Sequence, residues 1–272
     1  SQRARFYLSK EKENKAQKMI IDLAKALEKS TVQCLEDRVA IAFSGGLDSA
    51  TLAAIAKKNC ETFLFCAGTE DSDDLASAEI AARELSLPLE KIILDEKSIL
   101  ELYGKIHSFY PGVLPKIEIG IPILAACEAA KKKELSAILF GTGAEELFVG
   151  YERYYGYFEE GKDLEKILRN EYETLKDKDM AMVKKIAYKC NLEARFPFYD
   201  KQLSELVFKI PLEERMAERE LKKGILREMG KMLGTPASSL KRKKKAAQYG
   251  SGVHRIVMRH ADELNIAFPK KA

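Results

Sequence analysis

The fold is decided by the stretch Val39-Ala40-Ile41-Ala42-Phe43-Ser44-Gly45-Gly46-Leu47-Asp48-Ser49. Five apolar residues without a break predict a buried strand, and strong helix formers follow the motif up to Lys58. The two glycines between them allow a tight turn whose backbone N–H groups point toward an anion at the positive end of the helix. This pattern predicts a strand, a phosphate-binding loop and a helix, with an ordinary tight turn as the alternative.

The same alternation continues along the chain. Strands are expected at residues 62–67, 91–94 and 137–140, separated by helices at 73–85 and 123–133. Strands that alternate with helices predict an α/β fold with a doubly wound parallel sheet, whose ligands bind at the carboxyl ends of the strands.

The two ends of the chain have a different pattern. Residues 9–29 carry apolar side chains at helical spacing, and helix follows helix beyond Tyr151. We therefore expect an N-terminal helix (1–30), an α/β core (31–150) and a helical C-terminal portion (151–272), all packed as one catalytic unit.

Composition narrows the class of protein. The 272 residues are 46% hydrophobic, enough for a sizeable core, and no run reaches the roughly 18 apolar residues of a membrane span. The five cysteines never form Cys-x-x-Cys spacing, and the three histidines form no ligand pattern with them. We expect reduced thiols, no zinc, no membrane partner and a cytoplasmic location.

The net charge of +4 is concentrated near the C-terminus in Lys241-Arg242-Lys243-Lys244-Lys245. Such a run is explained by a solvated face, by a nucleic-acid surface or by phosphate binding inside an active site.

The glycine loop lacks the Gly-Lys-Ser/Thr ending of a Walker loop. Asp48 stands where a lysine would be expected, and a carboxylate beside phosphates is reasonable if Mg²⁺ bridges the two. The hydroxyls of Ser44 and Ser49 add hydrogen-bond donors.

The six residues from Ser44 to Ser49 resemble the pyrophosphate loop of the ATP pyrophosphatase superfamily, which includes asparagine, β-lactam, NAD and GMP synthetases and several tRNA-modifying enzymes. The resemblance implies that ATP is bound, that its α-phosphate is attacked, and that adenine meets the backbone at the ends of the first two strands. The nucleotide-binding residues implied here are Phe43, Ser44, Gly45, Gly46, Leu47, Asp48, Ser49, Cys66 and Ala67.

A second stretch, from Gly141 to Tyr151, is similar to the asparagine synthetase segment Ser-Gly-Glu-Gly-Ala-Asp-Glu-Leu-Phe-Gly-Gly-Tyr. The resemblance implies that Gly141 and Thr142 lie against the nucleotide and that Glu145 joins Asp48 as a Mg²⁺ ligand. An exposed helix N-terminus would also explain Glu145 and its neighbour Glu146. Thr142 replaces the glutamate that the family uses near the acyl-adenylate, and a hydroxyl cannot supply that charge.

Residues 191–200 resemble the synthetase signature Leu-Glu-Ala-Arg-Val-Pro-Phe-Leu-Asp. We expect a structural corner tied by an Arg195–Asp200 or a Glu193–Arg195 pair. The helix at 73–85 is expected to be capped by Ser72 or Asp73. Asp73 and Asp74, in the acidic stretch 70–74, are expected to form an acidic cap of this helix, and the resemblance offers a ribose- or substrate-facing loop as the alternative.

The tail from Lys223 onward resembles the synthetase C-terminus, where lysines reach back to the phosphates. We assign Lys244 as the transition-state lysine, Lys245 as the next candidate and Lys223 as a supporting cation, all counted as catalytic with Glu145. Lys241 and Lys243 are expected on a solvated face. Gly250-Ser251-Gly252 suggests a loop able to close over the site.

The leading hypothesis is an asparagine synthetase-like ligase that uses ATP and Mg²⁺ to adenylate a small carboxylate, with aspartate as one candidate. Ammonia, another amine or a separate glutaminase subunit would supply nitrogen, because the chain does not open with a catalytic cysteine. A tRNA-modifying enzyme that grips tRNA with its basic tail and a nucleotide-binding regulatory protein are the alternatives. The sequence leaves assembly into a homo-oligomer open.

Overall fold

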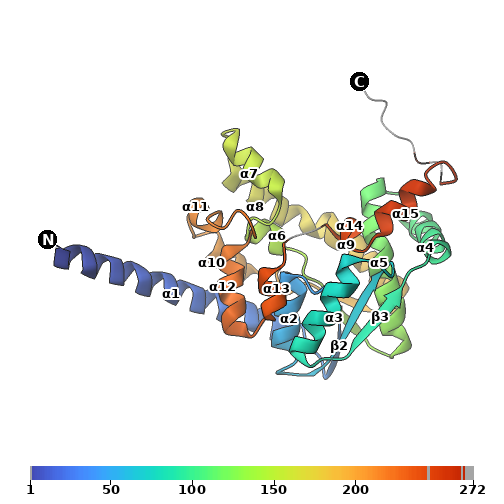
Figure 1. Cartoon of the computed structure of the whole chain (residues 1–272), viewed down its shortest axis with the longest axis horizontal. Coiled ribbons are helices and arrows are strands. Elements are labelled where there is room, and N and C mark those ends of the chain that lie inside the picture. Colours follow the sequence, from blue (N-terminus) through green and yellow to red (C-terminus); the bar gives the residue numbers. More distant parts are fainter. Residues whose placement is uncertain (1, 244–245, 265, 267–272) are drawn as a thin grey trace.

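The computed structural model describes residues 2–243, 246–264 and 266, with side chains from residue 14 onward. Its described part contains a five-stranded sheet in which all neighbours are parallel, in the order β3-β2-β1-β4-β5 (Figure 1). This confirms the α/β fold with a doubly wound parallel sheet. The strands are β1 Arg38–Ala42, β2 Glu61–Gly68, β3 Leu89–Ile93, β4 Ala137–Leu139 and β5 Glu193–Arg195.

The central strand β1 creates the point where the winding of the sheet reverses. It pairs with β2 on one side and with β4 on the other, so Ile41 has Leu64 and Leu139 as its lateral neighbours. The chain therefore leaves β1 and β4 at adjacent places on the same edge of the sheet. This is where doubly wound proteins bind ligands, and both glycine motifs begin there.

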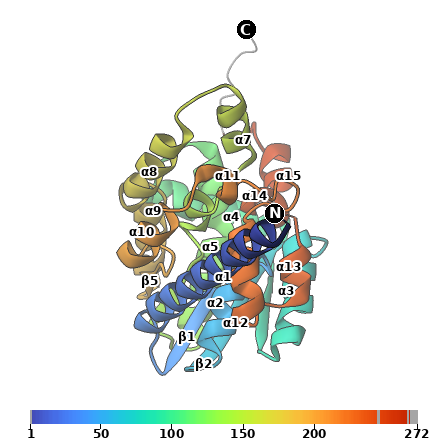
Figure 2. The same ribbon diagram turned by 90° about the vertical axis from the view of Figure 1, so that its left-hand side faces the viewer.

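Helices cover both faces of the sheet. In the N-terminal half of the chain, α2 and α3 pack against β2, and α5 packs against β2 and β3 (Figures 1 and 2). Helix α1 packs against α2, α10 and α12. The first turns of α1 project from the rest of the molecule in Figure 1. These first helices are α1 Gln2–Gln33, α2 Leu47–Ala56, α3 Asp73–Leu85, α4 Glu96–Phe109, α5 Leu114–Lys132 and α6 Ala144–Leu147.

The C-terminal portion is helical, as expected, apart from β5. Its helices are α7 Glu152–Glu159, α8 Leu164–Thr174, the 3₁₀ turn η1 Leu175–Asp177, α9 Asp179–Lys189, α10 Lys201–Val207, α11 Leu212–Arg215, α12 Gly224–Leu233, α13 Ala237–Lys241, α14 Ala247–Gly250 and α15 Val253–Arg259.

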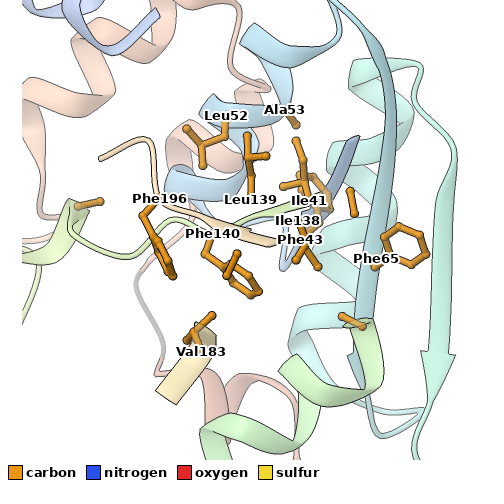
Figure 3. Packing of buried hydrophobic residues seen from close by; sticks show 14 of the residues in the cluster. Ile41, Phe43, Leu52, Ala53, Phe65, Ile138, Leu139, Phe140, Val183 and Phe196 are labelled. Atoms are coloured by element: carbon orange, nitrogen blue, oxygen red, sulfur yellow. The ribbon is translucent and has the colours of Figure 1, made fainter. Parts of the chain in front are cut away.

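One large core joins the sheet to the helices on both of its faces. Ile41, Ile138 and Leu139 are fully buried at its centre. Phe140, which follows β4, stacks on Phe196, which follows β5 (Figure 3). A smaller cluster under α7 and α8 contains Val149, Tyr154, Tyr155, Leu164 and Leu168. The large core extends from α1 to α15, so the sheet edge with the glycine motifs rests on rigidly packed elements.

Several boundaries differ from the sequence-based expectation. The helix expected at 123–133 begins at Leu114, where Pro115 fits the first turn and Pro122 is accommodated inside. Helix α4 was not predicted. Strand β5 was not predicted either, because a three-residue strand with one apolar residue shows no alternation of apolar and polar side chains. Among the described residues, no helix combines the length and apolar character needed to cross a membrane.

Candidate active site

The loop after β1 is shaped by its glycines. Gly45 has a φ of +68°, and a Cβ built there would lie 2.5 Å from the carbonyl oxygen of Ser77. Gly46 is the N-cap of α2 and receives no side-chain cap bond, so the first amides of this ten-residue helix can face an anion. The Ser44 hydroxyl accepts a hydrogen bond from the Gly46 N–H at 3.3 Å. The geometry fits the predicted phosphate cradle.

The loop after β4 lies directly against this first loop. A Cβ on Gly141 would lie 2.8 Å from the Cβ of Asp48, so only glycine allows the two loops to approach this closely. Gly143 adopts a φ of +103° and starts the short helix α6, on which Glu145 is buried. The two motifs therefore form one site, as predicted from their common edge of the sheet.

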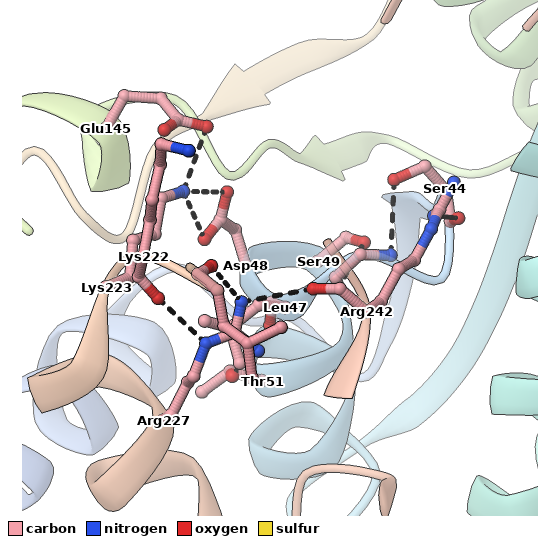
Figure 4. A network of polar contacts seen from close by, with 12 residues as sticks. Ser44, Leu47, Asp48, Ser49, Thr51, Glu145, Lys222, Lys223, Arg227 and Arg242 are labelled. Atoms are coloured by element: carbon pink, nitrogen blue, oxygen red, sulfur yellow. Dashed lines mark hydrogen bonds and ion pairs between the residues drawn. The ribbon is translucent and has the colours of Figure 1, made fainter. Parts of the chain in front are cut away.

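Three charged groups from distant parts of the chain meet in this site (Figure 4). The Lys223 ammonium donates to both carboxylate oxygens of Asp48, at 2.8 and 2.7 Å, and lies 2.9 Å from a carboxylate oxygen of Glu145. Lys223 is 3% exposed. Because solvent screens a buried pair weakly, this cluster concentrates charge at the mouth of the cradle.

Lys223 is presented by a strained segment. Lys222 and Lys223 both adopt left-handed backbone angles, with φ of 58° and 56°. The buried Arg227 guanidinium holds this segment by donating to the carbonyls of Leu221 and Lys222, at 2.5 and 2.8 Å, and it also donates to that of Leu240 at 2.5 Å. Burial lowers the pKa of Arg227. Such strain persists only where surrounding contacts fix it, as they do here.

Arg242 ties the C-terminal segment to the cradle. Its guanidinium donates to the backbone carbonyl of Ser44 and lies 2.7 Å from the Asp74 carboxylate. A second tie comes from the buried Ser239 hydroxyl, which donates to the Gly45 carbonyl at 2.8 Å. The cationic segment is thus joined to the glycine loop by side-chain to backbone bonds.

These elements enclose a cavity of about 180 Å³. The glycine loop forms one part of its wall, and cationic side chains from the C-terminal portion of the chain form another. The lining residues are Ala42, Ser44, Gly46, Leu47, Asp48, Ser49, Asp74, Gly141, Leu221, Lys222, Lys223, Arg227, Arg242, Lys243 and Ala247.

Most of the predicted loop residues line this cavity. Glu145 lies behind it, in contact with Lys223. Phe43, Gly45 and Thr142 belong to the two loops, and Cys66 and Ala67 lie near the end of β2. All five are outside the lining, and their assignment to the nucleotide stays a prediction. Lys244 and Lys245 lie outside the described residues.

Ser72 is the N-cap of α3, one of the two residues expected there, because its hydroxyl accepts from the Leu75 N–H at 3.4 Å. Asp73 and Asp74 lie in the first turn of this helix. The sequence did not reveal that Asp74 also lines the cavity and pairs with Arg242 at 2.7 Å. Lys243 is exposed, as expected, and pairs with Glu220 at 2.8 Å, but it also lines the cavity.

The corner at residues 191–200 has the structural character that was predicted. Arg195 pairs with Glu193 at 2.7 Å and also with Glu36, so the Glu193 tie forms. The expected alternative with Asp200 is wrong, because Asp200 caps α10 by accepting from the Leu203 N–H at 2.7 Å.

The predicted closing loop packs over the end of β2. The Thr69 N–H donates to the Ser251 carbonyl at 2.8 Å, and a Cβ on Gly250 would lie 2.4 Å from a carboxylate oxygen of Asp74. The tail beyond it is pinned by His254, whose Nδ1 lies 2.8 Å from the buried Glu118 carboxylate.

The donor set fits a hard cation. The described residues contain no cluster of three or more acidic, histidine or cysteine ligands. Asp48 and Glu145 nevertheless converge on one cationic group, the Lys223 ammonium. Two carboxylates suit a Mg²⁺ ion that takes its remaining ligands from phosphates and water.

Comparisons with known proteins agree with the motifs. A model of the asparagine synthase family matches residues 22–162 and 156–265. A putative glutamine-hydrolyzing asparagine synthetase of Methanocaldococcus jannaschii is 32% identical over 92% of this chain and 52% of its own length. Asparagine synthetase B of Escherichia coli is 27% identical over 85% of this chain and 45% of its own.

The solved structure of an NMN synthetase from Francisella tularensis covers 94% of this chain and 99% of its own, at 13% identity and a TM-score of 0.40. That likeness is too low to carry an argument. The chain spans about half the length, or less, of the curated relatives named above. Since the family match extends over most of the sequence, this chain belongs to the asparagine synthase family.

Proposed function

We propose that this chain is an ATP-dependent ligase that adenylates a small carboxylate and passes the acyl group to ammonia or another amine. The observation that carries the proposal is the charged cluster of Asp48, Lys223 and Glu145 at the mouth of the glycine cradle. A phosphate cradle beside the half-buried Asp48, the buried Glu145 and the buried Lys223 ammonium is suited to nucleotide chemistry at phosphorus.

The cradle suits departure of pyrophosphate rather than transfer of the γ-phosphate. In the first step, a carboxylate oxygen of the substrate attacks the α-phosphorus of ATP, and the bond from that phosphorus to the α,β-bridging oxygen breaks. The electron pair leaves with pyrophosphate, which the amides at the start of α2 and the hydroxyls of Ser44 and Ser49 would bind. Lys223, with the predicted Lys244 and Lys245, would stabilise the charge that develops on the leaving group.

Asp48 and Glu145 are the residues that would hold Mg²⁺. When bound, Mg²⁺ neutralises charge on the phosphates and so lowers the barrier to attack by an anionic nucleophile. Asp48 reaches the cavity from the first turn of α2, and Glu145 supports the same position from α6.

In the second step, the amine nitrogen attacks the acyl carbon, the bond to the adenylate oxygen breaks, and AMP leaves. The acceptor side of the site contains Thr142 where asparagine synthetases carry a glutamate. Aspartate is therefore one candidate substrate among small carboxylates, and ammonia or a separate glutaminase subunit is the proposed nitrogen source. The relatives named above are described as glutamine-hydrolyzing, which is consistent with such a source.

Pyrophosphate exchange tests this proposal. Wild-type protein is incubated with labelled pyrophosphate and Mg²⁺-ATP across a panel of amino acids and tRNA. We expect label to enter ATP with one carboxylate and to fall by about two orders of magnitude in Asp48→Asn, because a single electrostatic contact at the reacting centre has that effect.

Asp22→Asn, an exposed carboxylate on α1, serves as the matched control and should exchange normally. Exchange that requires tRNA would favour a tRNA-modifying enzyme. ATP binding without exchange for any candidate would contradict the ligase proposal and favour a nucleotide-binding regulatory protein.

A further inference from the structure

The position of the Lys223 ammonium is unusual for a phosphate-binding lysine. It lies at the mouth of the cradle, within 2.9 Å of Asp48 and Glu145, which are the two carboxylates proposed as metal ligands. In this position the ammonium offsets the charge of the buried Glu145 and of the half-buried Asp48, and a buried carboxylate without a counterion is unfavourable. Lys223 therefore performs the electrostatic task of a metal ion at this place.

An ammonium and a divalent ion exclude each other here. Mg²⁺ binds carboxylate oxygens at about 2.0–2.1 Å, so an ion shared by the two acids would overlap the space that the Lys223 Nζ fills. Repulsion between the two cations in a buried site adds to this conflict. Binding of the metal to Asp48 and Glu145 requires the ammonium to leave.

The surroundings of Lys223 permit the side chain to move while its backbone stays fixed. The hydrogen bonds from Arg227 hold the carbonyls of the two preceding residues. Within the described part of the chain, the hydrogen bonds and ion pairs of this side chain are made by its terminal ammonium, and its Cε lies close to Gly150. A Cβ on Gly150 would lie 2.3 Å from this Cε and 1.7 Å from a carboxylate oxygen of Glu145.

The direction available to the ammonium is the cavity. Lys223 lines it together with Ser44 and Ser49, whose hydroxyls are proposed to bind the pyrophosphate. A lysine ammonium on a flexible four-carbon stem can turn from one anion to another, whereas a planar guanidinium is more constrained.

We propose that Lys223 occupies the divalent-cation position of the nucleotide-free protein and gives it up to the metal, turning its ammonium to the phosphates of the arriving nucleotide. The inference rests on the proposed metal ligands Asp48 and Glu145. This exchange explains why the Lys223 ammonium contacts two carboxylates. Lys223 neutralises Asp48 and Glu145 before the metal binds, and the metal neutralises them afterwards.

The neighbouring Lys222 supplies a matched control. It has the same left-handed backbone and lines the same cavity, but its ammonium pairs with the exposed Glu152 at 2.7 Å. Removing its charge leaves the Asp48 and Glu145 carboxylates with their counterion.

Mn²⁺ binding without nucleotide tests the exchange, because it is measured by electron paramagnetic resonance of the free ion and needs no catalysis. Loss of a competing cation should tighten Mn²⁺ binding by at least about tenfold in Lys223→Met. Lys222→Met should bind as wild type does. Adding Asp48→Asn to Lys223→Met should abolish the gain.

Equal Mn²⁺ affinity in wild type and Lys223→Met would overturn the proposal, and so would an equal gain in Lys222→Met. If Lys223→Met fails to fold, a crystal structure of the wild type in Mn²⁺ decides. The expected result is an anomalous peak between Asp48 and Glu145, with the Lys223 Nζ beyond hydrogen-bonding distance of both. An ammonium that still bridges the acids beside bound Mn²⁺, or a peak elsewhere, would contradict the exchange.

The experiments distinguish a failure of the proposed cation exchange from a failure of the proposed ligase reaction. Pyrophosphate exchange in the wild type with no change of Mn²⁺ affinity in Lys223→Met would overturn the cation exchange alone. Tighter Mn²⁺ binding in a protein that shows no pyrophosphate exchange would support the cation exchange and contradict the proposed reaction.

Discussion

The two walls of the cavity are built in different ways. The glycine loop at residues 44–49 is shaped by its own sequence, through a left-handed glycine and the start of α2. The second wall, formed by Lys222, Lys223, Arg227 and Arg242, comes from the C-terminal portion of the chain. Arg227 holds it by bonds to nearby backbone carbonyls, and Arg242 by a long-range bond to the Ser44 carbonyl. The first wall is encoded locally, whereas the second exists only when the C-terminal helices are packed.

The largest effect is expected from a change to the locally encoded wall. Gly45→Ala places a Cβ against the backbone of Ser77 and in a left-handed conformation. Together the strain and the overlap should lower the free energy of unfolding by about 3 kcal/mol and abolish pyrophosphate exchange. Urea denaturation measures the first quantity.

Gly104 on α4 gives the matched control, because nothing lies within 4 Å of a Cβ built there. Gly104→Ala should stabilise the protein by about 0.5–1 kcal/mol, since alanine favours a helix. A Gly45→Ala protein with wild-type stability and exchange would show that the loop geometry is not required.

This difference explains what could be predicted from the sequence. The strand at residues 39–43, the glycine loop and the second motif at 141 are short and contiguous, so their conformations follow from residue type. The hydrogen bonds of Arg227 have no such signature, because their acceptors are backbone carbonyls positioned by α12 and α13. The pairing of Asp74 with Arg242 was not predicted either, since the two residues are distant in sequence.

The missed helix α4 is a different case. Its buried residues Ile99, Leu102, Tyr103 and Ile106 recur at the spacing of an amphipathic helix, so the sequence did contain the signal. The three-residue strand β5 carried none, since Ala194 is its one buried residue. Lys244 and Lys245 lie outside the described residues, and their proposed roles rest on the resemblance alone.

A smaller effect is expected from the second wall. Arg227→Met removes the donor that serves the Leu221, Lys222 and Leu240 carbonyls. Leaving these acceptors without their charged donor should cost about 2 kcal/mol of stability. The rate of pyrophosphate exchange should fall even under conditions where the variant is fully folded, because the backbone that presents Lys223 would relax.

Arg219→Met is the control for this variant, because that arginine is exposed and pairs with surface acids. Its effect on stability should be smaller than that of Arg227→Met, because solvent screens exposed ion pairs. Equal losses in the two variants would contradict a specific role for Arg227 in holding the second wall.

The smallest loss of stability is expected from Ser239→Ala, which removes a single hydrogen bond between the two walls. Ser239→Ala removes the buried donor to the Gly45 carbonyl and should cost about 1 kcal/mol in thermal or chemical unfolding. The adjacent Ser238 hydroxyl has no hydrogen-bond partner within the described residues. Ser238→Ala should therefore change stability by less than about 0.5 kcal/mol, and the reverse ranking would argue against this tie.

The central claim is that the two walls together direct attack on the α-phosphate of ATP. It is tested most directly by following oxygen from a ¹⁸O-labelled carboxylate substrate, chosen from the exchange panel, with ATP and hydroxylamine as the amine. The account predicts AMP that carries one labelled oxygen, together with unlabelled pyrophosphate, when the products are analysed by mass spectrometry. Label in inorganic phosphate, with ADP as the nucleotide product, would show attack at the γ-phosphate and contradict the account.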